Sequence, residues 1–247
     1  MLKKRKMLLS GFVILVFGIA LVVDAGTIAI NENFESTSVG NMPSGWSLNG
    51  SSAGVTDLVG FNSDKSLLIK DETSDYRPYV TKYGEMQFEE TLFRFYFKLD
   101  EEKSDSFTFR LDDGSSSYWF LKVFIGDGNK VKATSGGSTV EVVDDIDRSA
   151  WTQIDVLIGT GPSQYGTVYS STYEITVTYG SNSVEKTLNM YYNKRHIKRL
   201  AILTGSTADG ENLYVDNVYL GDPNLVPEPI TLLFLLPGVI VSSKRFL

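Results

Sequence analysis

The stretch from Glu90 to Asp100 reads ETLFRFYFKLD, and from Phe93 onward its apolar and polar or amphipathic side chains alternate. The apolar members point to one side of an extended chain: Phe93, Phe95, Phe97 and Leu99. The intervening members point to the opposite side: Arg94, Tyr96 and Lys98. A repeat of two residues is typical of a β-strand with one buried face. The stretch therefore predicts a strand that packs a stripe of phenylalanines into a core.

The same pattern recurs along the chain on both sides of this stretch. In segment 118–125, four apolar side chains share the expected inner face: Trp119, Leu121, Val123 and Ile125. Further strands are expected at Thr27–Phe34, Ser66–Lys70, Ser106–Asp112, Trp151–Ile158, Tyr173–Tyr179, Val184–Asn189, Lys198–Thr204 and Leu213–Leu220. Turn-forming pairs such as Asp113-Gly114 and Gly136-Gly137 separate them. Short strands at this spacing predict an all-β fold, a two-sheet antiparallel β-sandwich or jelly roll.

The composition excludes several classes of site. The chain has 247 residues, no cysteine and one histidine, His196. Disulfides, thiolate metal sites and cysteine nucleophiles are therefore excluded, and we place His196 in a solvated basic loop or strand edge. Six of the 23 basic and two of the 30 acidic residues belong to the two ends, which leaves a body with 17 basic and 28 acidic residues. Its net charge of −11 disfavours nucleic acid as a partner and is compatible with neutral glycans or divalent cations.

Residues 1–25 have the organisation of a secretory signal peptide. A cluster of basic residues, Lys3–Lys6, precedes an apolar run from Met7 to Val23. Small residues follow at the Ala25-Gly26 junction, where we expect cleavage by signal peptidase. An uncleaved membrane anchor is the alternative, because the run approaches the length that spans a bilayer.

The last 22 residues combine a chain break, an apolar segment and a positive stop. The break is Val226, Pro227, Glu228 and Pro229, the apolar run extends from Ile230 to Val241, and Lys244 and Arg245 follow it. This order resembles the PEP-CTERM sorting signal of exported bacterial proteins. The resemblance implies an apolar sorting helix in transient contact with the membrane, and processing by an exosortase-type membrane enzyme. An anchoring tail without processing is the alternative.

Two motifs in the body resemble a known family. Asn33-Phe34-Glu35 precedes a Gly-x-x-Pro-x-Gly-Trp turn ending at Trp46, and Tyr214-Val215-Asp216-Asn217-Val218 lies near residue 220. Together they resemble the concanavalin A-like, or laminin-G-like, jelly rolls and the calcium-containing carbohydrate-binding modules. The resemblance implies a jelly-roll domain over residues 26–221, a linker at 222–225 and the sorting signal at 226–247. Such a domain pairs its first and last strands, which hides edges that would otherwise bind other chains.

The same resemblance implies a structural calcium ion held by Glu35 and Asp216. Calcium takes six to eight oxygen ligands, so loop carbonyls would have to complete the site. The strand around Asp216 is apolar on both faces, which predicts partial burial of this carboxylate. Hydrogen bonds from backbone amides, or an arginine partner, are the alternative explanation for a buried aspartate.

Side chains expected on an outer face suggest a glycan platform. By the alternation of their strands, Tyr96, Arg110, Tyr118 and Phe120 all point away from the core. Exposed rings stack on sugars and arginines bind their hydroxyls, so these residues form our predicted glycan-binding site. A second layer or a long loop covering these rings is the alternative.

Motifs of known catalytic centres are absent from the sequence. It contains no Glu-x-Asp-x-x-Glu strand of the laminarinase type, no Gly-x-Ser-x-Gly elbow, no zinc-binding His-Glu-x-x-His and no phosphate-binding loop. The sequence predicts an exported, non-catalytic surface or extracellular-matrix protein that binds extracellular polysaccharide. A purely structural surface protein without a ligand, and an atypical glycoside-active enzyme, are the alternatives.

Overall fold

Alternating residues form strands throughout the described part of the chain. The computed structural model describes residues 28–49, 52–71, 79–87, 90–100, 106–115, 119–126, 128–159, 172–191, 196–205 and 210–226. These residues contain the strands β1 (Ile28–Glu32), β2 (Trp46–Asn49), β3 (Ala53–Thr56), β4 (Ser66–Lys70), β5 (Tyr79–Gln87), β6 (Thr91–Leu99), β7 (Ser106–Asp112), β8 (Trp119–Gly126), β9 (Lys130–Ser135), β10 (Ser138–Val143), β11 (Thr152–Ile158), β12 (Thr172–Tyr179), β13 (Asn182–Asn189), β14 (His196–Leu203) and β15 (Asn212–Gly221). The expected signal peptide and the tail beyond Val226 lie outside the described residues.

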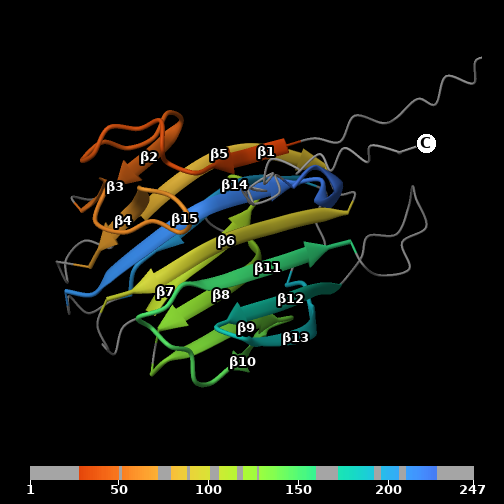
Figure 1. Cartoon of the computed structure of the whole chain (residues 1–247). Helices are drawn as coiled ribbons and strands as arrows, with labels where there is room; N and C mark the ends of the chain where they lie inside the picture. Colours follow the sequence, from red (N-terminus) through yellow and green to blue (C-terminus); the bar gives the residue numbers. More distant parts are fainter. Residues whose placement is uncertain are drawn as a thin grey trace, which may run out of the picture.

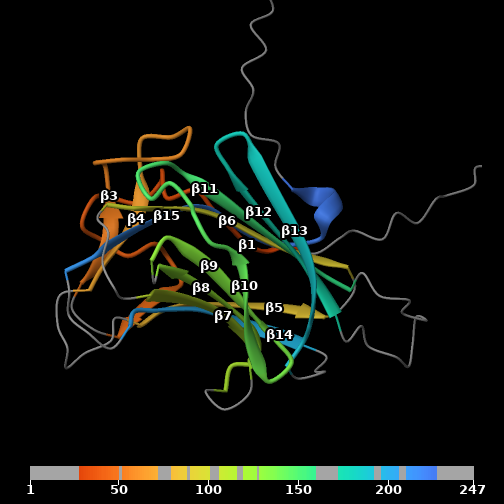
Figure 2. The same cartoon turned by 90° about the horizontal axis from the view of Figure 1, so that it is seen from below.

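The strands form two antiparallel sheets that lie face to face (Figures 1 and 2). The eight-stranded sheet has the order β13-β12-β11-β6-β15-β4-β3, and β1 pairs with β15 beside this path. The order of the seven-stranded sheet is β10-β9-β8-β7-β14-β5-β2. The predicted two-sheet antiparallel sandwich is therefore confirmed.

The core lies between the two sheets and is rich in phenylalanine. Phe93, Phe95 and Phe97 of β6 are each 1% exposed or less, as the alternation predicts. Phe95 stacks across the core on Phe109 of β7, with ring centroids 4.0 Å apart and planes 12° apart. Burying such rings is the main stabilising contribution to folding, and each contributes about 2–3 kcal/mol.

The chain changes sheets between β6 and β7. These strands follow each other in sequence, yet β6 pairs with β11 and β15, whereas β7 pairs with β8 and β14. Outward side chains of β6 and β7 therefore lie on opposite faces of the molecule. Tyr96 belongs to the outer face of the eight-stranded sheet and Arg110 to that of the seven-stranded sheet, so the prediction that they share one face is wrong.

A β-bulge changes the alternation at the start of β8. Leu111 of β7 lies opposite Leu121, but Asp112 lies opposite Trp119, so Phe120 is the extra residue of the bulge. A bulge of this kind adds one residue to a strand and reverses the direction of the side chains before it. Phe120 is consequently 0% exposed, and Trp119 takes the outer position. The prediction of an outward Phe120 and an inward Trp119 is wrong for this reason.

The first and last strands pair, as expected. β1 runs antiparallel to the second half of β15, from Ile28 opposite Gly221 to Glu32 opposite Val218. A short 3-10 turn, Pro223–Leu225, follows β15 and is capped by the Asp222 carboxylate. Within the described ranges, no helix is both long enough and apolar enough to span a membrane.

Candidate binding face

A row of four side chains crosses the outer face of the seven-stranded sheet. The strand register places Tyr83 of β5 opposite Arg199 of β14, Arg199 opposite Asp112 of β7, and Asp112 opposite Trp119 of β8. We call these four residues the transverse row. Adjacent strands lie about 4.8 Å apart, so the row extends roughly 14 Å from Tyr83 to Trp119.

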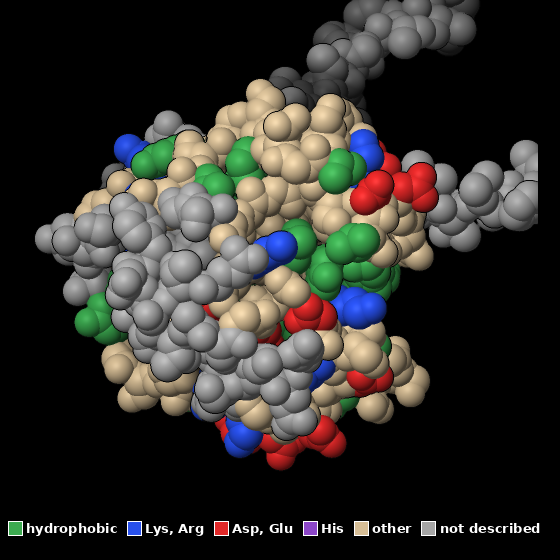
Figure 3. Space-filling view, turned by 90° about the vertical axis from the view of Figure 1, so that its left-hand side faces the viewer, with side chains coloured by type: hydrophobic (Ala, Val, Ile, Leu, Met, Phe, Trp, Pro, Cys, Tyr) green, Lys and Arg blue, Asp and Glu red, His purple; other side chains and the backbone are tan. Residues whose placement is uncertain are grey.

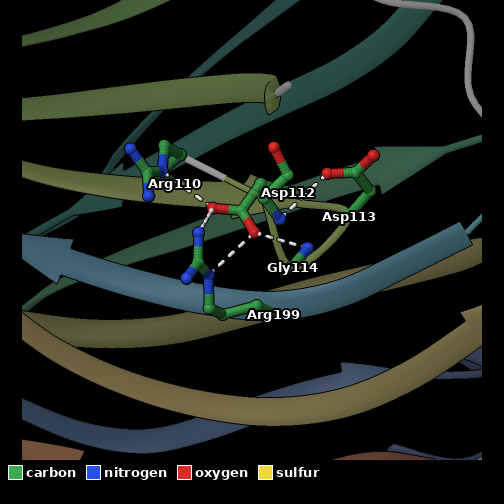
Figure 4. Close-up of polar contacts among 6 residues, drawn as sticks. Arg110, Asp112, Asp113, Gly114 and Arg199 are labelled. Atoms are coloured by element: carbon green, nitrogen blue, oxygen red, sulfur yellow. Dashed lines mark hydrogen bonds and ion pairs between the residues drawn. The ribbon is translucent and has the colours of Figure 1, made fainter. Parts of the chain in front are cut away.

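The centre of the row is a buried ion-pair network around Asp112 (Figure 4). Arg199 donates to both carboxylate oxygens, from Nε at 2.8 Å and from Nη2 at 2.9 Å. Arg110 donates from Nε at 2.9 Å, and the Gly114 backbone N–H donates at 2.9 Å. Asp112 is 0% exposed and both arginines are less than 10% exposed. Four donors on one carboxylate hold all of these groups in fixed positions.

Gly114 completes this network because of its backbone conformation. Its φ of +87° lies in the left-handed region, which glycine adopts without a steric cost. This conformation lies in a bend of the chain just after β7 and aims the Gly114 N–H at Asp112. The Asp113-Gly114 turn predicted from the sequence is therefore confirmed, and it also serves the network.

Aromatic rings mark both ends of the transverse row. Tyr83 is 58% exposed, and the Arg199 guanidinium carbon lies 5.8 Å from its ring centroid. At the other end, Trp119 stacks on Tyr191, with centroids 4.1 Å apart and planes 10° apart. The Lys122 Nζ lies 4.1 Å from the Trp119 centroid. A ring beside a cation is a favourable electrostatic arrangement and gives each end both an apolar and a charged group.

The bulge at Phe120 also positions Tyr191. The Phe120 carbonyl accepts a hydrogen bond of 3.0 Å from the Tyr191 N–H. Tyr191 follows β13 in the chain and in this way reaches the seven-stranded sheet, where it is 37% exposed. One local irregularity in β8 therefore turns Trp119 outward and supplies the acceptor that brings Tyr191 onto its ring.

The outer face of the eight-stranded sheet is organised differently. Phe61, from the loop between β3 and β4, stacks on Tyr96 with centroids 3.9 Å apart and planes 16° apart. Trp151 meets the edge of Phe61 at 5.9 Å. Burial raises the pKa of Tyr96, while Arg94 opposes this rise. A loop thus covers Tyr96, which is the alternative that the sequence left open.

The carboxylate of Asp216 holds the same loop. Asp216 is 0% exposed and accepts hydrogen bonds of 2.7 Å from the Phe61 N–H, the Ser63 hydroxyl and the Asn217 N–H. Burial raises its pKa to about 6, and the charge of Glu35 adds to the increase. The expected burial of Asp216 and its alternative partners, backbone amides, are both observed.

Glu35 contacts the same loop at Lys65. Its carboxylate accepts from the Lys65 N–H at 2.8 Å, and the Lys65 ammonium donates to the carbonyls of Glu35 and Thr37 at 2.8 and 2.9 Å. The described residues contain no group of three or more His, Cys, Asp or Glu side chains placed to hold a metal ion. A calcium ion bound by Glu35 and Asp216 would therefore have to compete with the Lys65 ammonium for these carbonyls. Calcium binding stays a prediction.

The structure separates the three described residues of the predicted glycan site, Tyr96, Arg110 and Phe120. Tyr96 is covered on one sheet, Arg110 is bonded to Asp112 on the other, Phe120 is in the core, and Tyr118 lies outside the described residues. Sequence reasoning missed the residues of the transverse row. The alternation of β7 already placed Asp112 on the side of Arg110, but no sequence signal connects them to Tyr83 or Arg199.

The end of the sandwich shown in Figure 3 presents no extended apolar area among its coloured atoms. Hydrophobic side chains lie there in small groups between polar atoms, and acidic side chains gather at the lower margin and at the right (Figure 3). Scattered apolar groups of this size are normal for a protein surface.

No family model matches the chain, and no curated protein is significantly similar to it. Solved structures do resemble it. A sialidase superposes with a TM-score of 0.61 at 11% identity over 80% of this chain, which corresponds to 19% of the sialidase's length. A Bauhinia forficata lectin in complex with GalNAc superposes with a TM-score of 0.52 at 11% identity, over 80% of this chain and 98% of the lectin.

A third similar structure is the carbohydrate recognition domain of Emp47p, with a TM-score of 0.52 at 10% identity, over 77% of this chain and 93% of that domain. The two-sheet β-sandwich of this chain therefore resembles the fold of these lectin domains. At such identities the likeness concerns the fold alone. Lectin-type sandwiches have two outer faces, and in this one the transverse row distinguishes the face of the seven-stranded sheet.

Proposed function

We propose that this chain is an exported, non-catalytic protein of the cell surface or extracellular matrix, and that its lectin-type sandwich binds polysaccharide. The transverse row carries this proposal. It places an exposed ring at each end of a face whose centre is fixed by the Asp112 network: Tyr83 at one end, and Tyr191, stacked on Trp119, at the other. Rings offer flat apolar surface to the C–H faces of sugars, and a rigid frame reduces the entropy lost on binding.

The test is a binding panel of soluble polysaccharides against the full-length chain in mild detergent, read by affinity electrophoresis. We expect retardation by at least one polymer, and a loss of affinity of about tenfold or more in Tyr83→Ala and in Trp119→Ala. The matched control is Leu58→Ala, which truncates a residue that is 74% exposed and lies in the loop covering the opposite face. Absence of binding to every polymer would refute the proposal and favour a purely structural role. Release of reducing sugar would instead support the glycoside-active alternative.

Export and sorting form the second part of the proposal. Signal peptidase would remove residues 1–25, and an exosortase-type enzyme would recognise Val226–Pro229 while the apolar run contacts the membrane and Lys244 and Arg245 remain at its surface. Fusing residues 222–247 to an exported reporter tests this directly. Replacement of Pro227, Glu228 and Pro229 by alanine should redirect the reporter. A location that ignores this replacement would contradict the sorting proposal and would leave glycan binding unaffected.

A structural calcium ion at Glu35 and Asp216 is a separate proposal. It is supported by two carboxylates near one loop, since the charge of Glu35 contributes to the raised pKa of Asp216. Calcium should raise the melting temperature of the wild-type chain relative to a chelator, and it should not do so in Asp216→Ala. Identical melting temperatures of the wild type with calcium and with chelator would refute the calcium site.

A further inference from the structure

Positive charge gathers on the outer face of the seven-stranded sheet. The strand register places five basic side chains there: Arg110, Lys122, Lys130, Lys132 and Arg199. The acidic side chains that the register places on the same face are Asp112 and Glu141. Among the described residues of β7, β8, β9, β10 and β14, and without counting Lys198 at the bulge of β14, the face therefore has an excess of three positive charges.

The opposite face has the reverse balance. Its described strands present three basic side chains, Lys70, Arg94 and Lys98, and four acidic ones, Asp155, Glu174, Glu185 and Asp216. The whole chain has a net charge of −7. An acidic chain repels anionic polymers at long range. The excess of positive charge on one face is therefore a local feature that the composition of the chain does not predict.

The cations of this face stand beside its rings. Lys122 lies over Trp119, and Arg199 lies beside Tyr83. Lys198 flanks Tyr83 as well, because a Cβ placed on Gly114 would be 3.8 Å from both the Lys198 Cβ and the Tyr83 Cε1. A ring next to a cation matches a sugar that has an apolar C–H face and an anionic substituent.

The environment of Lys122 points to the same class of ligand. Partial burial lowers the pKa of Lys122, and the nearby charge of Arg110 lowers it further. A carboxylate or sulfate bound at this position would offset both effects, because it returns a hydrogen-bond acceptor and a negative charge to the ammonium. A neutral sugar would offset only part of the desolvation.

We propose that the polysaccharide bound by this face is acidic, and that its uronic acid carboxylates or sulfate esters contact Lys122 while its sugar rings stack on Tyr83 and on Tyr191, the ring that covers Trp119. This inference rests on the proposed function and specifies its ligand class. The transverse row is about 14 Å long, so it accommodates several consecutive sugars that cross the strands. Exposed rings at both ends favour a polymer with apolar sugar faces over nucleic acid, whose outer surface is phosphate.

The experiment compares matched polymers against the full-length chain: polygalacturonate, the same polymer with its carboxyl groups reduced, dextran sulfate, dextran and duplex DNA. We expect polygalacturonate or dextran sulfate to bind at least about tenfold more tightly than its neutral counterpart, and the affinity to fall as NaCl rises from roughly 50 to 500 mM. The two arms distinguish carboxylate from sulfate ester.

Equal binding of polygalacturonate and its carboxyl-reduced form, without a preference for dextran sulfate, would overturn the acidic ligand and leave the proposed function intact. Absence of binding to any polymer would refute both the acidic ligand and the proposed function. Binding to duplex DNA as tight as that to the acidic polysaccharides would also overturn the inference, because charge alone would then account for it.

Lys122→Gln provides the residue-level test, and Lys98→Gln is its control. Both lysines are half-buried in the outward position of a central strand, Lys122 on the seven-stranded sheet and Lys98 on the eight-stranded one. Lys122→Gln should weaken binding of the acidic polymer about five- to tenfold, the effect of losing one charge-assisted hydrogen bond. Lys98→Gln should leave it unchanged. Equal affinities of the two variants, with unchanged melting temperatures, would refute the role of Lys122.

Discussion

The two outer faces of this sandwich follow the same alternation and serve different purposes. On the eight-stranded sheet, the outward Tyr96 lies beneath Phe61, and Asp216 fastens the loop that carries Phe61. On the seven-stranded sheet, outward rings stay accessible at Tyr83 and Tyr191, and the buried charges lie between them. Whether a side chain points away from the core is therefore a weak guide to whether it can bind a ligand. What covers the side chain determines whether a ligand can reach it.

The largest effect should separate two Arg–Asp pairs, one on each face. Asp112→Ala would leave Arg110 and Arg199 buried without their carboxylate, so the free energy of unfolding should fall by about 3–5 kcal/mol. Asp155→Ala removes the bidentate partner of Arg94, whose pair is 25% and 22% exposed, and should cost about 1 kcal/mol or less. Chemical denaturation of both variants measures the difference, and similar losses would contradict this contrast between the faces.

The second prediction concerns the pH dependence of Asp216. Its pKa in the folded protein is about 6, above the ordinary value of 3.8, so the folded state holds more protons than the unfolded state between these values. Stability should therefore decrease as pH rises from about 4 to about 6, by roughly 3 kcal/mol, and then level off. Asp216→Asn should flatten this part of the profile.

The control for that profile is Asp147→Asn. Asp147 is exposed, and hydrogen bonds from Ser149 lower its pKa, so it titrates below this window. Its replacement should leave the decrease between pH 4 and 6 in place. Urea denaturation at several pH values provides the measurement, and a profile of Asp216→Asn that matches the wild type would rule out this aspartate as the source.

The third prediction compares one ring from each face. Phe61→Ala should lower the free energy of unfolding by about 2 kcal/mol, because the stacking on Tyr96 and the contact with Trp151 are lost. Tyr83→Ala should change stability little, since Tyr83 is 58% exposed, and should instead reduce polysaccharide affinity. The reverse result, a stable Phe61→Ala and an unstable Tyr83→Ala, would invert the assignment of the two faces.

The smallest effect is expected at Gly114. Its φ of +87° strains any other residue, so Gly114→Ala should cost about 1 kcal/mol and loosen the N–H contact with Asp112. Gly137→Ala is the control, because its added Cβ would make an ordinary contact of 3.9 Å with Tyr191. Thermal melts of both variants measure the difference. Equal melting temperatures would show that the turn conformation is not critical to the network.

The sequence was a good guide to strands and a poor guide to their neighbours. The stripe of Phe93, Phe95 and Phe97 predicted β6 and its buried face, because local alternation determines both. It could not reveal that the chain changes sheets before β7, since the choice of partner strand depends on contacts distant in sequence.

Two details of the site could not be predicted from local sequence patterns, for similar reasons. The bulge at Phe120 depends on pairing with β7, so alternation alone placed Trp119 and Phe120 on the wrong faces. Asp216 receives its hydrogen bonds from Phe61 and Ser63, more than 150 positions earlier in the chain. Its burial was predictable from the apolar strand around it, whereas the identity of its partners was not.

The pairing of β15 has a mechanical consequence. This strand has β6 on one side, and β4 followed by β1 on the other, so it is an interior strand near both of its ends. Tension applied to the chain after Val226 would act along β15. It would load the hydrogen bonds on both sides of the strand together, in shear. An edge strand, in contrast, would lose its hydrogen bonds one at a time. A body attached through its tail would in this way transmit force into the middle of its sheet. Single-molecule pulling from the C-terminal side should accordingly show one high rupture event, and gradual peeling at low force would contradict it.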